Sequence, residues 1–218
     1  MRTLEQRLYK HIDLLIERYP RLESSRQDII DAYLILEESY ENNGKLLIVG
    51  NGGSAADAEH TVGELMKAFV LPRPLDADYK AALNSVDSEL GAVLGENLQA
   101  ALPAIALDGH IALSTAYMND CEPLLCFAQQ VNGFGCKGDV FLGISTSGNS
   151  KNVLYAAVVA KAKGMKVIGL TGAKENKLMK YADVCIRVAQ TETYMIQELH
   201  LPVYHTLCLM LEEHFFGK

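Results

Sequence analysis

The sequence predicts an α/β protein in which helices cover both faces of a five-stranded parallel sheet, giving three layers preceded by N-terminal helices. Two observations predict this fold. Continuous apolar runs recur along the chain, as in parallel strands buried on both faces, and they alternate with stretches of helical periodicity. Strands that alternate with helices are joined by right-handed crossovers and form a parallel sheet. At 218 residues, the length favours a single domain over residues 1–218.

Residues 1–43 are expected to form a pair of helices. Apolar residues recur every three or four positions over residues 4–16 and again over residues 33–40. A break near Pro20 separates the two stretches. The glycine of "ENNGK" then ends the second helix, immediately before the first apolar run.

Five apolar runs are expected to be strands, and helices are expected between them. The strands are residues 46–50, 102–109, 139–145, 166–172 and 183–189. Residues 151–165 and 174–182 follow two of these runs and are expected to be helical. A long helix is expected at the C-terminus.

Residues 71–101 are the least readable part of the sequence. Two prolines and several acidic residues open the segment, and residues 88–101 look helical despite two internal glycines. The segment could be a mobile flap, an extra helix near a site, or a surface insertion. We favour the insertion, because loops accept extra residues at small entropic cost.

Charge and cysteine content exclude several classes of function. Lys and Arg number 20 against 27 Asp and Glu, a net charge of −7, which argues against nucleic acid or an anionic membrane as partner. Charges interrupt the first 22 residues, so these form neither a signal peptide nor a membrane span, and a cytoplasmic protein is expected. Five scattered cysteines without a CxxC pair indicate buried free thiols rather than disulfides or a zinc knuckle.

Two glycine- and serine-rich turns follow expected strands and are candidate phosphate sites. The first is "GNGGS", residues 50–54, and the second is "GISTSGNS", residues 143–150. Glycines let the backbone approach an anion, and a helix N-terminus offers free N–H groups. The second turn adds the hydroxyls of Ser145, Thr146, Ser147 and Ser150. Either turn could instead be only a tight strand-to-helix connection with a capped helix. Neither turn matches the Walker A or GxGxxG motif of nucleotide-binding proteins.

Two pairs of polar residues on expected helices are candidates for chemistry. His60 and Glu64 stand four apart and share a helix face, as acid and base, as metal ligands, or as a solvent-facing ion pair. Gln197 and His205 lie about 12 Å apart along the C-terminal helix. Pro202 lies between them and is expected to kink the helix and so to adjust their relative position.

Three further histidines carry no functional signal. His200 lies about 140° round the helix from His205, so a surface or packing position is expected. His110 and His214 have no pattern around them. None of the three is expected in the site.

Three segments together resemble a known family. Residues 50–65, 143–150 and 196–205 are similar to the signature segments of the sugar isomerase (SIS) fold, in its phosphoheptose isomerase branch. The resemblance implies a flavodoxin-like fold and interconversion of sedoheptulose 7-phosphate and D-glycero-D-manno-heptose 7-phosphate. It also implies a homotetramer with active sites at the subunit interfaces.

The resemblance, with the hydroxyls of the two turns, gives a set of expected site residues. The expected substrate contacts are Asn51, Gly52, Gly53, Ser54, Glu64, Asn119, Asp120, Ser145, Thr146, Ser147, Ser150 and Gln197. One zinc ion (Zn2+) per subunit is implied, with the ligands His60, Glu64, Gln197 and His205. Glu64 is then the base and His205 the acid of an enediol(ate) mechanism, although a metal-bound carboxylate is a weaker base than a free one.

Other functions are compatible with parts of this pattern. An isomerase of another phosphorylated ketose is the strongest alternative, because Ala55 and the long segment 71–101 depart from the family pattern near the expected sugar site. A regulatory sugar-phosphate sensor would need the hydroxyl turn but not Glu64. A non-catalytic binding protein of the DnaA initiator-associating type would lack the Glu64, Gln197 and His205 set, which this chain has, so an enzyme is favoured.

Overall fold

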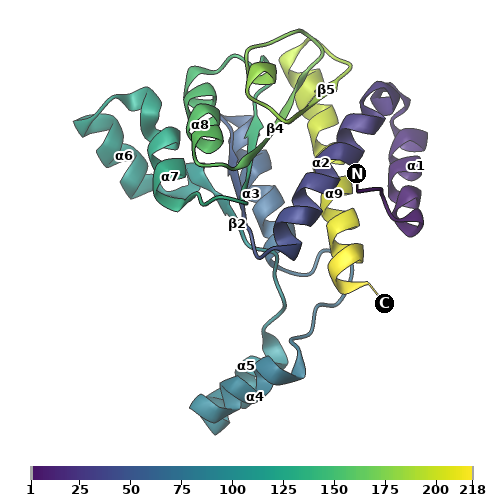
Figure 1. Cartoon of the computed structure of the whole chain (residues 1–218), viewed down its shortest axis with the longest axis vertical. Coiled ribbons are helices and arrows are strands. Elements are labelled where there is room, and N and C mark those ends of the chain that lie inside the picture. Colours follow the sequence, from purple (N-terminus) through teal and green to yellow (C-terminus); the bar gives the residue numbers. More distant parts are fainter. Residues whose placement is uncertain (1, 218) are drawn as a thin grey trace.

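The computed structural model describes residues 2–217 and contains one five-stranded parallel sheet. Its strand order is β2-β1-β3-β4-β5, with helices on both sides (Figure 1). The strands are β1 (Leu46–Val49), β2 (Ala104–Ala106), β3 (Val140–Ile144), β4 (Lys166–Gly172) and β5 (Val184–Val188). The predicted fold class is confirmed.

The strands are apolar throughout because both faces of the sheet are covered. All residues of β1 are buried, and successive side chains point to opposite faces. Leu46 and Ile48 pack in a core with the N-terminal helices and the C-terminal helix. Leu47 and Val49 pack in a second core under the helices on the opposite face. The sheet therefore separates two hydrophobic cores.

The helices match most of the sequence expectations. They are α1 (Tyr9–Arg18), α2 (Arg26–Glu41), α3 (Gly53–Met66), α4 (Ala77–Val86), α5 (Ser88–Asn97), α6 (Ile111–Asp120), α7 (Cys126–Phe134), α8 (Lys151–Ala162) and α9 (Thr193–Phe216). The N-terminal pair, α8 and the long C-terminal helix were expected. The sequence analysis missed α6 and α7. Helix α9 continues through Pro202 without interruption.

The expected helix at residues 174–182 is wrong. The structure has only a short 3-10 turn there, Leu178–Lys180. The Asn176 side chain accepts a hydrogen bond from the backbone N–H of Met179, and the N–H of Lys177 donates to Asn149 of a neighbouring loop. These side-chain bonds replace helical backbone bonds, as Asn commonly does in turns.

Residues 71–101 contain a helical hairpin that projects from the body of the molecule (Figure 1). Helices α4 and α5 are each capped by an aspartate, Asp76 and Asp87, whose carboxylates accept backbone N–H bonds. Large apolar side chains remain exposed on the hairpin, among them Val86, Leu90 and Val93. The hairpin therefore presents apolar surface away from both cores.

Cysteine placement differs in part from the expectation. All five cysteines are free, as expected, and Cys126 and Cys208 are buried. Cys121 and Cys136 are exposed, so the expectation that the thiols are buried is wrong for these two. Within residues 2–217, no helix combines the length and apolar character needed to cross a membrane.

Candidate active site

The two glycine- and serine-rich turns meet at one edge of the sheet. In the strand order, β2 lies on one side of β1 and β3 on the other, so the chain reverses its direction of winding between β1 and β3. Ligands of open α/β sheets bind at such a position, beyond the carboxyl ends of the strands. Asn51 of the first turn and Asn152 next to the second exchange two amide hydrogen bonds, of 3.1 and 2.8 Å. The sheet topology therefore joins the two turns.

The first turn has two successive glycines, of which Gly52 is required by its backbone conformation and Gly53 leaves room for a neighbouring side chain. Gly52 has a φ of 58°, in the left-handed region that side chains disfavour. A Cβ at Gly53 would lie 2.6 Å from Nε2 of Gln197, so glycine lets this α9 side chain lie against the start of α3. Ser54 is buried. The turn thus brings Gln197 to the N-terminus of the helix that carries His60.

The second turn forms one wall of a small polar pocket. Ser145 Oγ lies 3.1 Å from Ser150 Oγ, and Ser147 Oγ accepts a 3.2 Å bond from the backbone N–H of Asn149. The pocket has a volume of about 180 Å³. That is smaller than the roughly 300–1,000 Å³ of typical small-molecule sites. It is therefore sized for one end of a substrate, such as a phosphate group.

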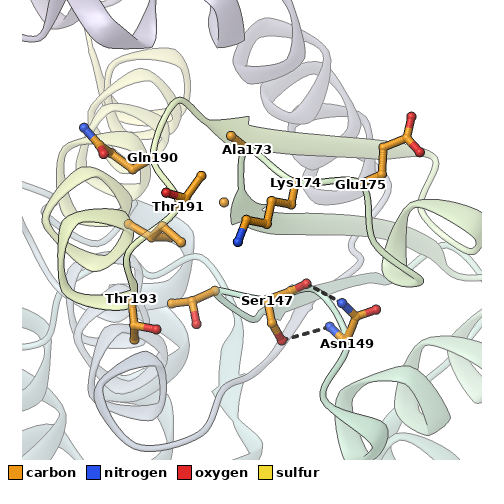
Figure 2. A pocket seen from close by; sticks show the side chains of 11 residues that line it. Ser147, Asn149, Ala173, Lys174, Glu175, Gln190, Thr191 and Thr193 are labelled. Atoms are coloured by element: carbon orange, nitrogen blue, oxygen red, sulfur yellow. Dashed lines mark hydrogen bonds between the residues drawn. The ribbon is translucent and has the colours of Figure 1, made fainter.

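Loops after β4 and β5 complete this pocket. Its walls include Thr146, Ser147, Lys174, Gln190, Thr191 and Thr193. The Lys174 side chain extends into the pocket between Thr191 and Ser147 (Figure 2). The sequence analysis missed Lys174 because it assigned that position to a helix. The pocket combines hydroxyl groups with the ammonium group of Lys174, a suitable lining for a phosphate. Glu175 also lines the pocket, but its carboxylate points away from Lys174 and Ser147 (Figure 2).

A second group of side chains lies where α3 and α9 face each other. His60 Nε2 is 3.2 Å from Glu64 Oε1, and the His60 and His205 ring centroids are 4.9 Å apart. Lys67 Nζ donates to Glu64 Oε2 at 2.9 Å. His60 and Glu64 thus make the contact that helical spacing allows, and this contact is an ion pair only when His60 is protonated. His205 lies beside them, so the pair does not simply face solvent.

Tyr204 and Asp57 orient His60, and the sequence analysis missed both. The Tyr204 hydroxyl is 3.1 Å from His60 Nδ1 and 3.3 Å from Asp57 Oδ1. If Tyr204 donates to Asp57, its oxygen accepts the Nδ1 proton of His60 and leaves Nε2 free as an acceptor. Such partners fix the tautomer of metal-binding histidines. Both residues lie within segments that resemble the family, but helical spacing alone did not indicate their contact.

The environment of His205 favours its neutral form. Burial lowers the pKa of His205, the positive charge of a protonated His60 lowers it further, and Glu64 opposes the shift. Within residues 2–217, His205 Nε2 is buried and has no hydrogen-bond partner. A neutral ring with an unpartnered nitrogen can give a lone pair to a metal ion.

The donor set fits zinc, which binds imidazole nitrogens and carboxylate oxygens. His60, Glu64 and His205 supply these donors, and Gln197 lies at Gly53, two helical turns before His60. Within residues 2–217, the ligand atoms of the first three do not all lie within 4.8 Å of one another. Closing on one ion would therefore require these side chains to rearrange.

A buried ion pair fixes the end of α3 against α9. The side chains of Arg73 and Glu212 are 0% and 1% exposed, and they contact at 2.8 Å. Arg73 also donates to the backbone carbonyls of Glu64 and Leu65. Burial alone would raise the pKa of Glu212, but three backbone N–H groups of residues 69–71 and Arg73 together lower it. This network fixes the backbone at Glu64 relative to α9.

Two expected substrate contacts lie elsewhere in the single chain. Asn119 and Asp120 end α6, are exposed, and hydrogen-bond to each other at 2.8 Å. Helix α6 lies at the outer side of α7, away from α3 and α9 (Figure 1). Neither residue lines the phosphate-sized pocket. Their role in substrate binding stays a prediction.

Comparison with known proteins shows which class of protein this chain resembles. A family model described as "SIS domain" matches residues 88–172. The phosphoheptose isomerase of Aneurinibacillus thermoaerophilus is 38% identical over 179 residues, which cover 82% of this chain and 77% of that protein. Phosphoheptose isomerase 2 of Campylobacter jejuni is 40% identical over 190 residues, with coverage of 87% and 82%.

Solved structures agree with these relatives. The phosphoheptose isomerase of Neisseria gonorrhoeae superimposes with a TM-score of 0.72 and 31% identity, over 97% of this chain and 100% of that chain. The enzyme of Francisella tularensis gives a TM-score of 0.74 and 29% identity, over 95% and 97%. The fold is that of an SIS-domain protein. Within that class, the chain belongs to the phosphoheptose isomerase family.

Proposed function

We propose that this protein interconverts sedoheptulose 7-phosphate and D-glycero-D-manno-heptose 7-phosphate. One observation carries the proposal: α9 runs from residues that line a hydroxyl-lined, phosphate-sized pocket, past Gln197, to His205, which lies beside His60. Thr193 and Ile196 of the same helix line that pocket, and Gln197 lies against Gly53 at the start of α3. A sugar phosphate held at one end by the pocket would extend toward His60 and Glu64.

The phosphate end of the substrate is bound by neutral and charged groups. The hydroxyls of Thr146 and Ser147 line the pocket and offer hydrogen bonds, and Lys174 offers positive charge there. Ser145 and Ser150 belong to the same turn but do not line the pocket, and their hydroxyls lie 3.1 Å apart. Charge-assisted bonds of this kind are stronger than neutral ones. The phosphate thereby anchors the substrate and leaves its carbonyl end free to react.

Isomerisation requires one proton to move between carbons and another between oxygens. Glu64 removes the proton from carbon 1 of the ketose and returns it to carbon 2 of the enediolate, which gives the aldose. His205 transfers the proton between the two oxygens. A neutral imidazole can donate in such a step, as known isomerases illustrate, and its lowered pKa keeps His205 neutral.

We further propose that one zinc ion per chain is held by His60, Glu64, Gln197 and His205. An ion held there supplies Lewis-acid polarisation of the substrate carbonyl. Imidazole has two nitrogens and a carboxylate has two oxygens. His205 and Glu64 can therefore each keep one atom for proton transfer while another binds the ion.

We also propose that the protein is a homotetramer with active sites at the subunit interfaces. Exposed apolar residues on the α4–α5 hairpin, such as Val86 and Leu90, and on α6, such as Ile111, support an interface between copies. Asn119 and Asp120 are exposed on α6 and would reach the site of a neighbouring copy. Light scattering after gel filtration should give four times the chain mass, and a monomer would contradict the proposal.

The activity is tested by product analysis with sedoheptulose 7-phosphate and a panel of other ketose phosphates, using metal-free and zinc-loaded protein. The proposal predicts turnover of the heptulose phosphate above the other sugars, increased by zinc. Preferred turnover of another ketose phosphate would change the substrate. No turnover of any sugar in either form would remove the enzymatic function.

A further inference from the structure

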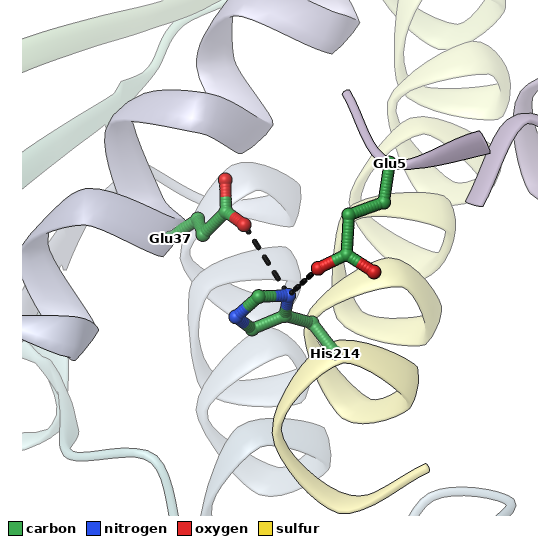
Figure 3. Close-up of side chains that lie close together, drawn as sticks. All are labelled: Glu5, Glu37 and His214. Carbon is green, nitrogen blue, oxygen red and sulfur yellow. Dashed lines mark ion pairs between the residues drawn. The ribbon is translucent and has the colours of Figure 1, made fainter. Parts of the chain in front are cut away.

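A second group of potential metal ligands lies far from the candidate active site. Glu5 from the N-terminal segment, Glu37 from α2 and His214 from α9 converge at one point (Figure 3). His214 Nδ1 is 2.9 Å from Glu5 Oε1 and 3.2 Å from Glu37 Oε1. Among residues 2–217, this is the one group of three His, Cys, Asp or Glu residues whose ligand atoms all lie within 4.8 Å of one another.

The three side chains lie within ion-pair distance, and this pairing requires a protonated His214. Within the described chain, His214 Nδ1 is buried and no hydrogen bond with good geometry satisfies it, despite its closeness to two carboxylates. Two carboxylates therefore converge on a single ring nitrogen. A metal ion between the three side chains would give each of them a partner.

A fully buried hydroxyl faces the same group. Tyr33 is 0% exposed, and within residues 2–217 its hydroxyl has no hydrogen-bond partner of good geometry. Tyr33 precedes Glu37 by one helical turn, so the two side chains share a face of α2. Burial and the nearby carboxylates of Glu37 and Glu5 raise the pKa of Tyr33, which keeps its hydroxyl protonated as a donor.

Neighbouring side chains are arranged to orient the three ligands. Arg7 Nε binds Glu5 Oε2 at 2.7 Å, which leaves Oε1 directed at His214. Glu41 Oε1 is 3.4 Å from His214 Nε2, so it can accept the Nε2 proton when Nδ1 gives its lone pair to an ion. Outer partners of this kind commonly fix the ring and tautomer of a metal-binding histidine.

We propose that Glu5, Glu37 and His214 form a binding site for a divalent transition-metal ion of the zinc class. One imidazole and two carboxylates are ligands that zinc accepts, and water would complete a tetrahedral shell. Glu5 is the most exposed of the three, with 42% of its side chain accessible, and provides the entry side. Glu37 and His214 are 9% and 15% exposed and form the enclosed side.

The site would have a structural role. It joins the N-terminal segment to α2 and α9, which are far apart in sequence. His214 lies nine residues after His205, about 13 Å further along α9, so the two sites are separate. An ion that binds only the folded chain stabilises it by mass action.

The test counts zinc ions in a protein whose active-site ligands have been removed. Equilibrium dialysis against zinc chloride is applied to the His60→Ala/His205→Ala variant, with metal content read by mass spectrometry. The proposal predicts that this variant retains one zinc ion per chain and that zinc raises its melting temperature. Adding Glu37→Gln, which keeps the side-chain shape, should abolish both effects. Glu38→Gln, on the exposed side of α2, should leave both unchanged.

Either of two results would overturn the proposal. The first is a His60→Ala/His205→Ala variant that folds, by circular dichroism, but retains no zinc. The second is equal zinc retention with and without Glu37→Gln. If the added substitution lowers stability, the metal count of the folded fraction at low temperature still decides between binding and its absence.

Discussion

Single side chains that were not predicted as site residues hold the reacting groups of the candidate site in place. Tyr204 and Asp57 orient His60, and Lys174 adds charge to the hydroxyl turn. Spacing along the sequence predicted the glycines, the hydroxyls and the His60–Glu64 pair because these lie within single local elements. It could not predict contacts that depend on how α3 meets α9 or on where a loop after β4 is directed.

Tyr204→Phe should weaken zinc binding by about 10- to 100-fold, because loss of an outer partner frees the tautomer and ring of His60. Zinc titration in competition with a chelator measures the change. Tyr194→Phe is the matched control, because Tyr194 is exposed near the start of the same helix. Equal zinc affinity in the two variants would show that Tyr204 does not position His60.

Lys174→Met should raise the KM for the sugar phosphate about tenfold, equivalent to about 1.4 kcal/mol, with little change in kcat. The ammonium group would contact the phosphate equally in the ground and transition states. The variant should also show a weaker dependence of KM on salt. Lys177→Met, outside the pocket, is the control, and similar kinetics for both variants would place the phosphate elsewhere.

At the scale of elements, the junction of α3 with α9 depends on the buried Arg73–Glu212 pair. Glu212→Gln should lower the free energy of unfolding by about 3–5 kcal/mol, because it leaves the buried guanidinium without a counter-charge. Urea unfolding measures the loss. The exposed Glu198→Gln, on the same helix, should change stability by about 0.5 kcal/mol or less. Equal midpoints for the two variants would contradict this role.

The elements were predictable to different degrees. The five strands and the helices at both ends of the chain follow from apolar periodicity, because burial determines them. Residues 174–182 have helical composition, but side-chain bonds from Asn176 and Asn149 select a turn. The expectation that Pro202 kinks α9 is not supported by any interruption of the helix. The projection of the α4–α5 hairpin depends on tertiary packing and not on local sequence.

At the scale of the whole molecule, a buried histidine links stability to pH. His200 is 0% exposed, and burial lowers its pKa to about 4 from an ordinary 6.5. Between these values the unfolded chain binds more protons than the folded chain, so stability rises with pH. The stabilisation that depends on neutral His200 is complete above pH 6.5, and up to about 3 kcal/mol of it is lost as the pH falls toward 4.

His200→Leu should remove this dependence, because leucine has no proton to bind. Free energies of unfolding between pH 4 and 7 measure this pH dependence. As the pH falls, the stability of the wild type should decrease relative to that of the variant. A difference that is constant across this range would mean that His200 titrates normally in the folded protein.

The whole fold was predictable because alternating apolar runs and amphipathic helices permit few topologies. The homotetramer was expected from the family resemblance and stays a prediction, and the apolar surface of the α4–α5 hairpin that supports it becomes visible only in the folded chain. The resemblance of three segments gave the family, and the topology explains why these segments lie together. Residues 50–65 and 143–150 follow or end the adjacent strands β1 and β3. Residues 196–205 lie on α9, and Gln197 of this helix lies against Gly53 in the first segment.

The central claim is that Glu64 moves a proton between carbons 1 and 2 of a phosphorylated heptose. Nuclear magnetic resonance of sedoheptulose 7-phosphate in heavy water, with wild-type protein and with Glu64→Gln, tests it most directly. With the wild type, we expect deuterium at carbon 2 of the aldose and, after reversal, at carbon 1 of the ketose, because the proton on the Glu64 carboxyl group exchanges with the solvent. Glu64→Gln should lower this incorporation about 10²-fold or more, with substrate binding retained. Incorporation at the wild-type rate in Glu64→Gln would contradict it.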